Sequence, residues 1–357
     1  MSLTPVGDRT PLGARTPITE SELIVFGDAA AGHDGVLSDS SGSVVVKPCT
    51  TAEIEFYESA ALHPTLAGYM PSYMGTLKLS SSGTVDEAVA TLGAAAASSQ
   101  PVGSIATSGT ASNLSPNDPG PLRGKKLETG LSIVLGNIAA PFKKPNILDV
   151  KLGAQLWDDG ASLQKRERLD KVAAETTSKS LGFRIAGMKV WQGVDKQNDP
   201  SVEATGYRVY DKFYGRKFSA DNVIEGFKEF LFVPTAGVGD DLGRTVAGMF
   251  LKQVEGMQKT LEALESRMYS ASVLFVYEGD GEALKKALEE EESRAPGTVQ
   301  PGEDDRDGEG DDGPGKAYDA KLIDFAHATW TPGQGPDENA LHGVRSTAKI
   351  LRDLARM

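Results

Sequence analysis

Cysteine and long hydrophobic runs are both nearly absent from this 357-residue chain. Cys49 is the only cysteine, which excludes a disulfide framework and any cysteine-rich metal site. The four histidines are too scattered to predict a histidine-bound zinc ion. No run of about 18 apolar residues occurs, so no membrane-spanning helix is expected. Residues 1–22 contain no apolar core of signal-peptide length. We therefore expect a soluble, intracellular protein.

Large apolar side chains are also scarce. Hydrophobic residues make up only 39% of the chain, which contains 40 glycines and 19 prolines. Part of the chain is therefore expected to remain outside the packed core. Residues 1–22 are predicted to be a flexible lead. Residues 80–124 consist mostly of Ser, Ala, Gly, Thr and Pro and are predicted to be a disordered insert or linker.

The negative charge is concentrated in one segment. Residues 280–315 contain 13 acidic and 4 basic residues, a net charge of −9 out of −13 for the whole chain. We interpret this segment as an acidic loop, either a solubilising insert or a nuclear interaction segment. The remainder of the chain carries a net charge of only −4, so the acidity does not argue against an anionic substrate bound elsewhere.

Strands and helices are predicted in a mixed order. Apolar or alternating patterns favour strands at 23–26, 43–47, 131–135, 146–151, 181–191, 206–213, 269–277 and 320–325. Helical spacing is found at 52–61, 162–178, 220–232, 242–266 and 340–356. The segment 269–277 is the most apolar strand and is expected at the centre of a sheet. Without regular alternation of strand and helix, the fold class is predicted to be α+β.

Lys47 lies at the end of a predicted strand, directly before a helix that contains Glu53 and Glu55. A strand-end lysine paired with a helix glutamate is typical of the small lobe of a kinase, where the lysine neutralises nucleotide phosphates. From the spacing alone, the alternative is that Lys47 is an ordinary solvated lysine. No GxxxxGK[ST] motif occurs in the chain, which excludes a P-loop enzyme.

Two further sites on predicted strands have the residue types that phosphoryl transfer requires. Asp149 and Lys151 lie two residues apart, so both side chains point to one face of the strand. A carboxylate and an ammonium group there can accept a hydroxyl proton and stabilise a moving phosphoryl group. Asp324 follows an apolar strand and precedes Phe325 and His327, a placement suited to a magnesium ligand. The alternative for Asp149 and Lys151 is a surface ion pair. The alternative for Asp324 is an aspartate in a turn.

The helix predicted over 162–178 is rich in basic residues. Lys165, Arg168 and Lys171 recur every three positions, next to Arg166. This stripe indicates a site for a polyanion such as an inositol phosphate or a phospholipid head group. Because Glu167 and Asp170 interleave with these cations, a solvated helix face is the alternative. Direct nucleic-acid binding is not expected, since the chain has no basic excess and its aromatic residues are not interspersed with the cations.

Taken together, these segments resemble the inositol polyphosphate kinase family. PNILDVKLG (145–153) matches the PxxxDxKxG signature of that family, SASVLFVYEG (270–279) is similar to its SSLLxVYEG strand, and IDFAH (323–327) to its magnesium-binding strand. The segments 161–188, AAGHDG (30–35) and Lys47–Pro48 resemble the fungal inositol polyphosphate multikinases in particular. The resemblance covers about residues 23–78 and 125–357.

The resemblance implies a two-lobe, kinase-like fold of the SAICAR-synthase type, related to protein kinases and ATP-grasp enzymes. The small N-lobe would span 23–138 and the large C-lobe 139–357. The resemblance also implies roles for single residues. ATP would be bound by Lys47, Glu53, Gly136, Ile138, Asp149 and Asp324. Asp149, Lys151 and Asp324 would be catalytic, and Asp324 would bind Mg2+. Substrate phosphates would be held by Lys151, Lys165, Arg166, Arg168 and His327.

The implied activity is that of an ATP- and Mg2+-dependent inositol polyphosphate multikinase, a phosphotransferase with an alcohol group as acceptor. It would act on inositol trisphosphate and tetrakisphosphate toward the pentakisphosphate, and a phosphoinositide lipid head group is a further candidate substrate. The alternatives are an inositol hexakisphosphate kinase that makes pyrophosphates, and a nuclear transcriptional cofactor or scaffold with incidental kinase activity. We expect a nuclear and cytoplasmic monomer, with transcription factors as candidate partners.

Overall fold

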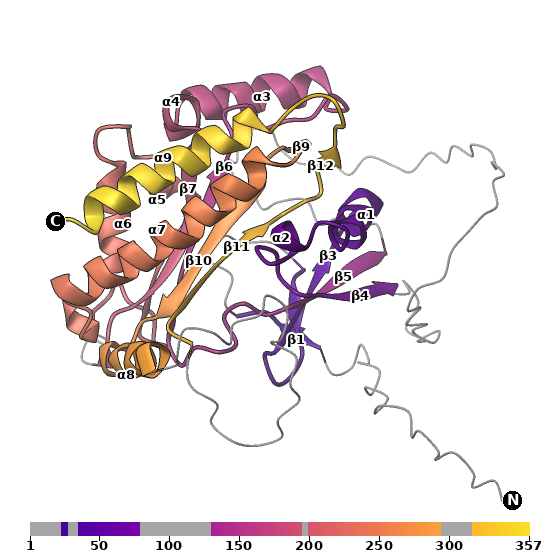
Figure 1. Cartoon of the computed structure of the whole chain (residues 1–357). Helices are drawn as coiled ribbons and strands as arrows, with labels where there is room; N and C mark the ends of the chain where they lie inside the picture. Colours follow the sequence, from indigo (N-terminus) through magenta and orange to yellow (C-terminus); the bar gives the residue numbers. More distant parts are fainter. Residues whose placement is uncertain (1–22, 28–34, 79–129, 195–198, 294–315) are drawn as a thin grey trace, which may run out of the picture.

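The chain forms two five-stranded antiparallel sheets (Figure 1). The boundary between them lies between β5 (Leu131–Gly136) and β6 (Pro145–Leu152). The structure, a computed structural model, describes residues 23–27, 35–78, 130–194, 199–293 and 316–357. The predicted flexible lead at 1–22 and the predicted insert at 80–124 lie outside the described residues. The same is true of 294–315, the larger part of the predicted acidic loop.

The first sheet, here called the N-terminal sheet, has the strand order β1-β2-β3-β5-β4. Its strands are β1 (Ile24–Val25), β2 (Leu37–Ser38), β3 (Val44–Pro48), β4 (Tyr73–Lys78) and β5 (Leu131–Gly136). In β3, side chains alternate between the two faces. Val44 and Val46 are buried together with Val134, whereas Val45 and Lys47 face the second sheet across a cavity. The strand pattern thus turns Lys47 toward the rest of the molecule.

Helix α1 (Thr51–Ala60) follows β3 and covers the N-terminal sheet. The side chain of Thr50 caps the helix by accepting a hydrogen bond from the Glu53 backbone N–H at 3.2 Å. Glu53, Phe56, Tyr57 and Ala60 form its buried face. Cys49, between the strand and the helix, is fully buried, and its backbone N–H donates to the Leu131 carbonyl. A short helix, α2 (Pro64–Ala67), leads to β4.

The second sheet, here called the C-terminal sheet, has the strand order β11-β10-β6-β7-β8. Its strands are β6 (Pro145–Leu152), β7 (Phe183–Trp191), β8 (Tyr207–Tyr210), β10 (Ser272–Glu278) and β11 (Tyr318–Ile323). The prediction that the segment around β10 is the central strand is wrong. That position belongs to β6, because β7 and β8 extend the sheet beyond it. β10 still pairs on both sides, which accounts for its apolar sequence.

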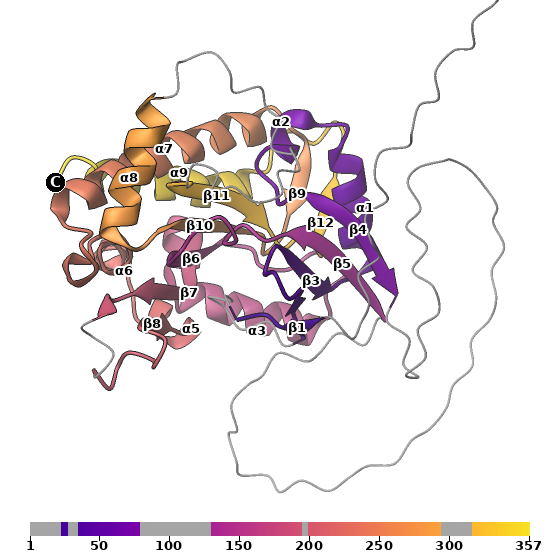
Figure 2. The same cartoon turned by 90° about the horizontal axis from the view of Figure 1, so that it is seen from below.

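The long helices α7 (Asp240–Glu262) and α9 (Glu338–Leu354) lie side by side across one face of the C-terminal sheet (Figure 1). Phe250 of α7 meets Phe275 of β10 with ring centroids 5.0 Å apart. In Figure 2, α5 lies beside β7 and β8, at the opposite edge of the sheet from β11. The remaining short elements are α5 (Lys212–Gly215), α6 (Val223–Leu231), a 3-10 turn (Pro234–Ala236), β9 (Ser266–Met268) and β12 (Ala328–Trp330).

Two predicted segments differ in detail from the structure. The helix predicted over 162–178 is divided into α3 (Leu163–Ala174) and α4 (Thr177–Leu181). Thr176 causes the break, because its extended backbone and side-chain oxygen cap the second helix. The predicted acidic loop begins instead with helix α8 (Gly281–Ser293). This helix has an apolar stripe formed by Leu284, Ala287 and Leu288. The prediction considered only the acidic residues of the segment and therefore missed this helical spacing.

An aromatic cluster joins the two halves of the molecule. Phe56 of α1 stacks on Phe325 and on Trp330, with ring centroids 5.0 Å apart in both pairs, and Tyr57 meets the edge of Phe325 at 5.2 Å. The indole N–H of Trp330 donates to Ser59 at 2.9 Å. Burying the rings of Phe56, Tyr57 and Phe325 contributes about 1.5–3 kcal/mol each. The cluster therefore fixes α1 against the segment that follows β11, which carries Asp324.

Candidate active site

A cavity of about 770 Å3, including its open mouth, lies between the two sheets. Its walls are mostly apolar, and its charged groups come from β3 (Lys47), β6 (Asp149) and the residue after β11 (Asp324). The lining side chains from the sheets include Val45, Lys47, Ile147, Asp149, Leu274, Ile323 and Asp324. Apolar walls and a few charged groups suit a flat aromatic base with an anionic tail.

The connection from β5 to β6 forms one wall of this cavity, and both Gly136 and Ile138 line it. The N–H of Gly136 already donates to the Ser72 carbonyl at 2.9 Å. Among the described residues, Ile138 makes no hydrogen bond, so its backbone groups are available to a ligand. The Asn137 side chain donates to the Gly42 carbonyl at 2.7 Å and therefore holds the neighbouring turn.

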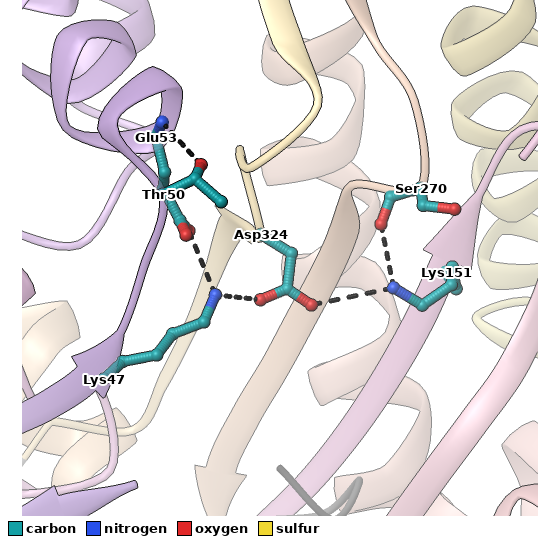
Figure 3. Close-up of polar contacts among 6 residues, drawn as sticks. All are labelled: Lys47, Thr50, Glu53, Lys151, Ser270 and Asp324. Atoms are coloured by element: carbon teal, nitrogen blue, oxygen red, sulfur yellow. Dashed lines mark hydrogen bonds and ion pairs between the residues drawn. The ribbon is translucent and has the colours of Figure 1, made fainter. Parts of the chain in front are cut away.

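The charged end of the cavity contains a chain of four alternating charges (Figure 3). Glu53 accepts a hydrogen bond from Lys47 at 3.0 Å, and Lys47 also donates to one oxygen of Asp324 at 2.6 Å. The other oxygen of Asp324 lies 3.6 Å from the Lys151 ammonium. The Glu53 side chain is only 1% exposed and touches the site through Lys47, so it positions this lysine and does not reach the cavity itself.

Electrostatics keep Lys47 charged. Burial alone lowers the pKa of its ammonium group, but the carboxylates of Asp324 and Glu53 more than offset this effect. The net result is a pKa well above the ordinary lysine value. Lys47 is therefore a permanent positive charge at the end of the cavity.

Asp324 has a left-handed backbone conformation, with φ of 67°. Such a conformation is rare for a residue with a side chain and costs about 1–3 kcal/mol. It persists here because Phe325, the next residue, is fully buried in the aromatic cluster. The consequence is functional: each carboxylate oxygen of Asp324 is directed to a different lysine (Figure 3).

Ser270, which precedes β10, is the other described residue with a side chain and a positive φ, 59°. Its carbonyl accepts a hydrogen bond from Lys151 at 2.8 Å, and its hydroxyl donates to the Leu156 carbonyl at 2.9 Å. Sequence reasoning missed this residue, because a backbone carbonyl that orients a lysine leaves no mark in residue spacing. Lys151 is thus held between Asp324 and Ser270.

The donor atoms at this end of the cavity fit a divalent metal ion shared with a nucleotide. Within the described ranges, no group of three or more Asp, Glu, His or Cys side chains could hold a metal by itself. Magnesium prefers one or two carboxylates completed by phosphate oxygens and water. Asp324, which lines the cavity, provides a suitable carboxylate.

The predicted substrate residues are only partly brought together. Lys165 Nζ lies 3.4 Å from His327 Nε2, and the other ring nitrogen of His327 bonds to the Asp158 carboxylate. Arg166 points elsewhere: its Nε donates to the Ala161 carbonyl at 2.8 Å, and its guanidinium stacks on Trp157. One helical step of about 100° separates it from Lys165. Arg168 is exposed.

Comparison with known proteins identifies the family. The family model for inositol polyphosphate kinase matches residues 132–352. The chain belongs to the inositol polyphosphate kinase family. It is 34% identical to the inositol polyphosphate multikinase of Saccharomyces cerevisiae, over 90% of this chain and 96% of that protein. It is 32% identical to human inositol hexakisphosphate kinase 3, but over 62% of this chain and 51% of that protein.

A solved structure is similar over nearly its whole length. The crystal structure of the inositol phosphate multikinase of S. cerevisiae, in complex with ADP and Mn2+, superimposes with a TM-score of 0.59 at 29% identity. The match covers 87% of this chain and 99% of that chain. These findings confirm the predicted family, the two-lobe α+β kinase-like fold and the enzyme class, an ATP-dependent kinase of inositol phosphates. No described helix is long and apolar enough to cross a membrane.

Proposed function

We propose that this inositol polyphosphate kinase is a multikinase. It transfers the γ-phosphoryl group of ATP to hydroxyls of inositol trisphosphate and tetrakisphosphate toward the pentakisphosphate, with Mg2+ as the metal. The observation that carries the proposal is the alternating chain Glu53–Lys47–Asp324–Lys151 at the end of an apolar cavity. The near full-length match to a fungal multikinase, against a partial match to a hexakisphosphate kinase, supports the choice within the family.

The nucleotide lies in the cavity with its base near Ile138 and its phosphates near Lys47. Val45 on one side and Ile147 and Leu274 on the other provide apolar surfaces for the base. Lys47, held by Glu53, neutralises phosphate charge without losing a proton. Asp324 would hold Mg2+, which would supply positive charge that neutralises the phosphates.

The acceptor lies beyond the phosphates, near Lys151. Asp149 is 3% exposed, lines the cavity and lies on the same face of β6 as Lys151. It orients the attacking hydroxyl and accepts its proton as the new O–P bond forms. Lys151, fixed by Ser270, stabilises the charge on the transferring group. Lys165 and His327, which lie together, contact the phosphates already on the ring.

Substrate turnover tests the proposal. The purified chain is incubated with ATP and Mg2+ and with inositol trisphosphate or, separately, inositol hexakisphosphate, and the products are resolved by anion exchange. We expect the trisphosphate to gain two phosphates. Turnover of the hexakisphosphate alone would replace the proposal with a pyrophosphate-forming kinase. Consumption of neither, by a folded protein that binds ADP, would favour a scaffold role.

A further inference from the structure

The residues between β5 and β6, here called the connecting segment (137–144), join the two sheets and form one wall of the cavity. Ile138 and Ala139 of this segment line the cavity. Among the described residues, the backbone of Ile138 makes no hydrogen bond, so its N–H and carbonyl groups can meet a ligand. Binding is strongest when such a segment already has its bound shape, because ordering each mobile residue costs free energy.

Asn137 holds the end of the connecting segment that adjoins the N-terminal sheet. Its backbone N–H donates to the Ser43 carbonyl at 2.8 Å, and its side-chain amide donates to the Gly42 carbonyl at 2.7 Å. Its side-chain oxygen accepts a hydrogen bond from the Ala139 N–H at 3.0 Å. The backbone is therefore fixed on both sides of Ile138.

Glu278, the last residue of β10, holds the other end of the connecting segment. Its carboxylate accepts hydrogen bonds from the backbone N–H groups of Lys143 at 2.6 Å and Lys144 at 3.0 Å. The N–H of Asp280 donates a third hydrogen bond at 3.0 Å. Glu278 is only 3% exposed, and a buried carboxylate requires such partners. Its charge is thus satisfied by the backbone that it holds.

The sequence of β10 places this carboxylate beneath the connecting segment. Leu274, Val276 and Glu278 alternate along the strand and therefore share one of its faces. Leu274 lines the cavity, and Val276 forms a small buried cluster with Ala139 and Phe142. The same face of β10 thus supports the cavity wall with apolar side chains and ends in a carboxylate that binds the backbone of that wall.

Gly279 brings the two backbones together. Its N–H donates to the Lys144 carbonyl at 2.7 Å. A Cβ atom at position 279 would lie 2.7 Å from that carbonyl oxygen and 2.6 Å from the side-chain oxygen of Asn146, so a larger residue does not fit. Glu278 and Gly279 together therefore use both backbone groups of Lys144, its N–H and its carbonyl.

We infer that Glu278 is a positioning residue for the nucleotide. It fixes Lys143 and Lys144 while Asn137 fixes the start of the segment, and Ile138 is thereby held where its backbone meets the base. The inference rests on the proposed function, which places the base near Ile138, and adds a residue that is not among those lining the cavity. Glu278 acts on nucleotide binding and not on phosphoryl transfer, since the charged groups of the site come from other elements.

Glu278→Gln tests the inference, with Asp337→Asn as the matched control. Asp337 is 2% exposed and also binds backbone N–H groups, those of Met268 at 2.7 Å and Ala340 at 3.0 Å. It caps α9 and is not among the described residues that line the cavity. Each substitution replaces one acceptor oxygen by an NH2 group, which leaves a backbone N–H without a partner. Both variants should therefore have a lower melting temperature than the wild type.

Nucleotide binding should separate the two variants. In calorimetric titration of ADP into the full chain, we expect Glu278→Gln to raise the Kd about 5- to 30-fold. In steady-state phosphorylation of inositol trisphosphate, it should raise the KM for ATP by a similar factor and change kcat by less than about threefold. Asp337→Asn should change each of these three quantities by less than about threefold, although it loses the same kind of hydrogen bond.

Equal Kd values of ADP for the two variants would overturn the positioning role and leave the multikinase proposal intact. Wild-type protein that binds ADP but does not phosphorylate the trisphosphate would overturn the multikinase proposal alone, and wild-type protein that does not bind ADP would overturn both.

Hydrogen exchange in the wild type tests the inference independently of whether Glu278→Gln folds. The amides of Lys143 and Lys144 should exchange at least about 100-fold more slowly than in an unfolded peptide before any nucleotide is added, because Glu278 already holds them. Protection of these amides that arises only with ADP would contradict the inference.

Discussion

Replacing Asp324 by Asn separates the role of this carboxylate in catalysis from its role in stability. The substitution keeps the shape of the side chain but removes the charge that lies 2.6 Å from Lys47 and 3.6 Å from Lys151. Removing one partner of a fully buried ion pair costs about 3–5 kcal/mol, and an exposed pair contributes about 0–1 kcal/mol. Asp324 is 14% exposed and Lys47 retains Glu53, so we expect a loss of about 1–2 kcal/mol.

The effect on turnover should be much larger. Loss of a metal ligand that neutralises transferring phosphate removes several kcal/mol of transition-state stabilisation, which corresponds to a fall in kcat of at least about 10³-fold. The assay is phosphoryl transfer from ATP to inositol trisphosphate at saturating Mg2+, together with thermal unfolding. At about 2–4 °C per kcal/mol, the melting temperature should fall by only a few degrees.

Asp319→Asn is the matched control. Asp319 lies on β11, the strand that Asp324 follows, is 4% exposed, and contacts Lys316 at 2.9 Å and Lys321 at 3.8 Å. It therefore also has two lysine partners, but it does not line the cavity. A kcat for Asp324→Asn within tenfold of the wild type, or an equal loss of kcat in Asp319→Asn, would refute the reasoning.

Three further predictions concern the residues around this carboxylate. Lys165→Glu should raise the KM for inositol trisphosphate at least about tenfold and leave the KM for ATP unchanged in steady-state kinetics, whereas Lys171→Glu, at a side chain that is 73% exposed, should change neither. In thermal unfolding, Ser270→Gly should be tolerated because φ is positive there, but Ser270→Val should lower the stability by about 1–2 kcal/mol; equal melting temperatures would contradict this strain. Because its carboxylate partners raise the pKa of Lys47 above 10.5, the stability from its ion pairs is complete below that pH and is lost only as the pH rises through the raised pKa. The difference in melting temperature between wild type and Lys47→Met should therefore stay constant between pH 7 and about pH 9, and a steady decline there would contradict the assignment.

The strands of the site could be predicted because local patterns determine them. The two-residue period of Pro145–Leu152 is sufficient to place Asp149 and Lys151 on one face. The Thr50 cap and the Glu53 ion pair follow from the few residues between β3 and α1. These features depend on neighbours in sequence, where periodicity and capping rules apply directly.

Contacts between distant segments could not be predicted in this way. Lys47 and Asp324 are 277 positions apart, and no spacing rule links them. The resemblance placed both at an ATP site, but their direct contact depends on how the aromatic cluster orients α1. Arg166 was predicted to hold a substrate phosphate, because it is a cation on the same helix as Lys165. It lies one helical step from Lys165, however, and its side chain donates to the Ala161 carbonyl in the preceding loop. Charge patterns therefore identify the helix but not which of its cations faces the ligand.

The buried cysteine between β3 and α1 provides a natural probe of opening at the nucleotide site. Burial raises the pKa of the Cys49 thiol to about 11, so at neutral pH the reactive thiolate is scarce as well as inaccessible. Because the chain has no other cysteine, any alkylation has a single origin. Its rate measures how often the N-terminal sheet opens near Lys47, and slower labelling in the presence of ADP would measure how strongly a nucleotide closes it. The motion of the nucleotide site can thus be followed in the unmodified protein, without an engineered probe.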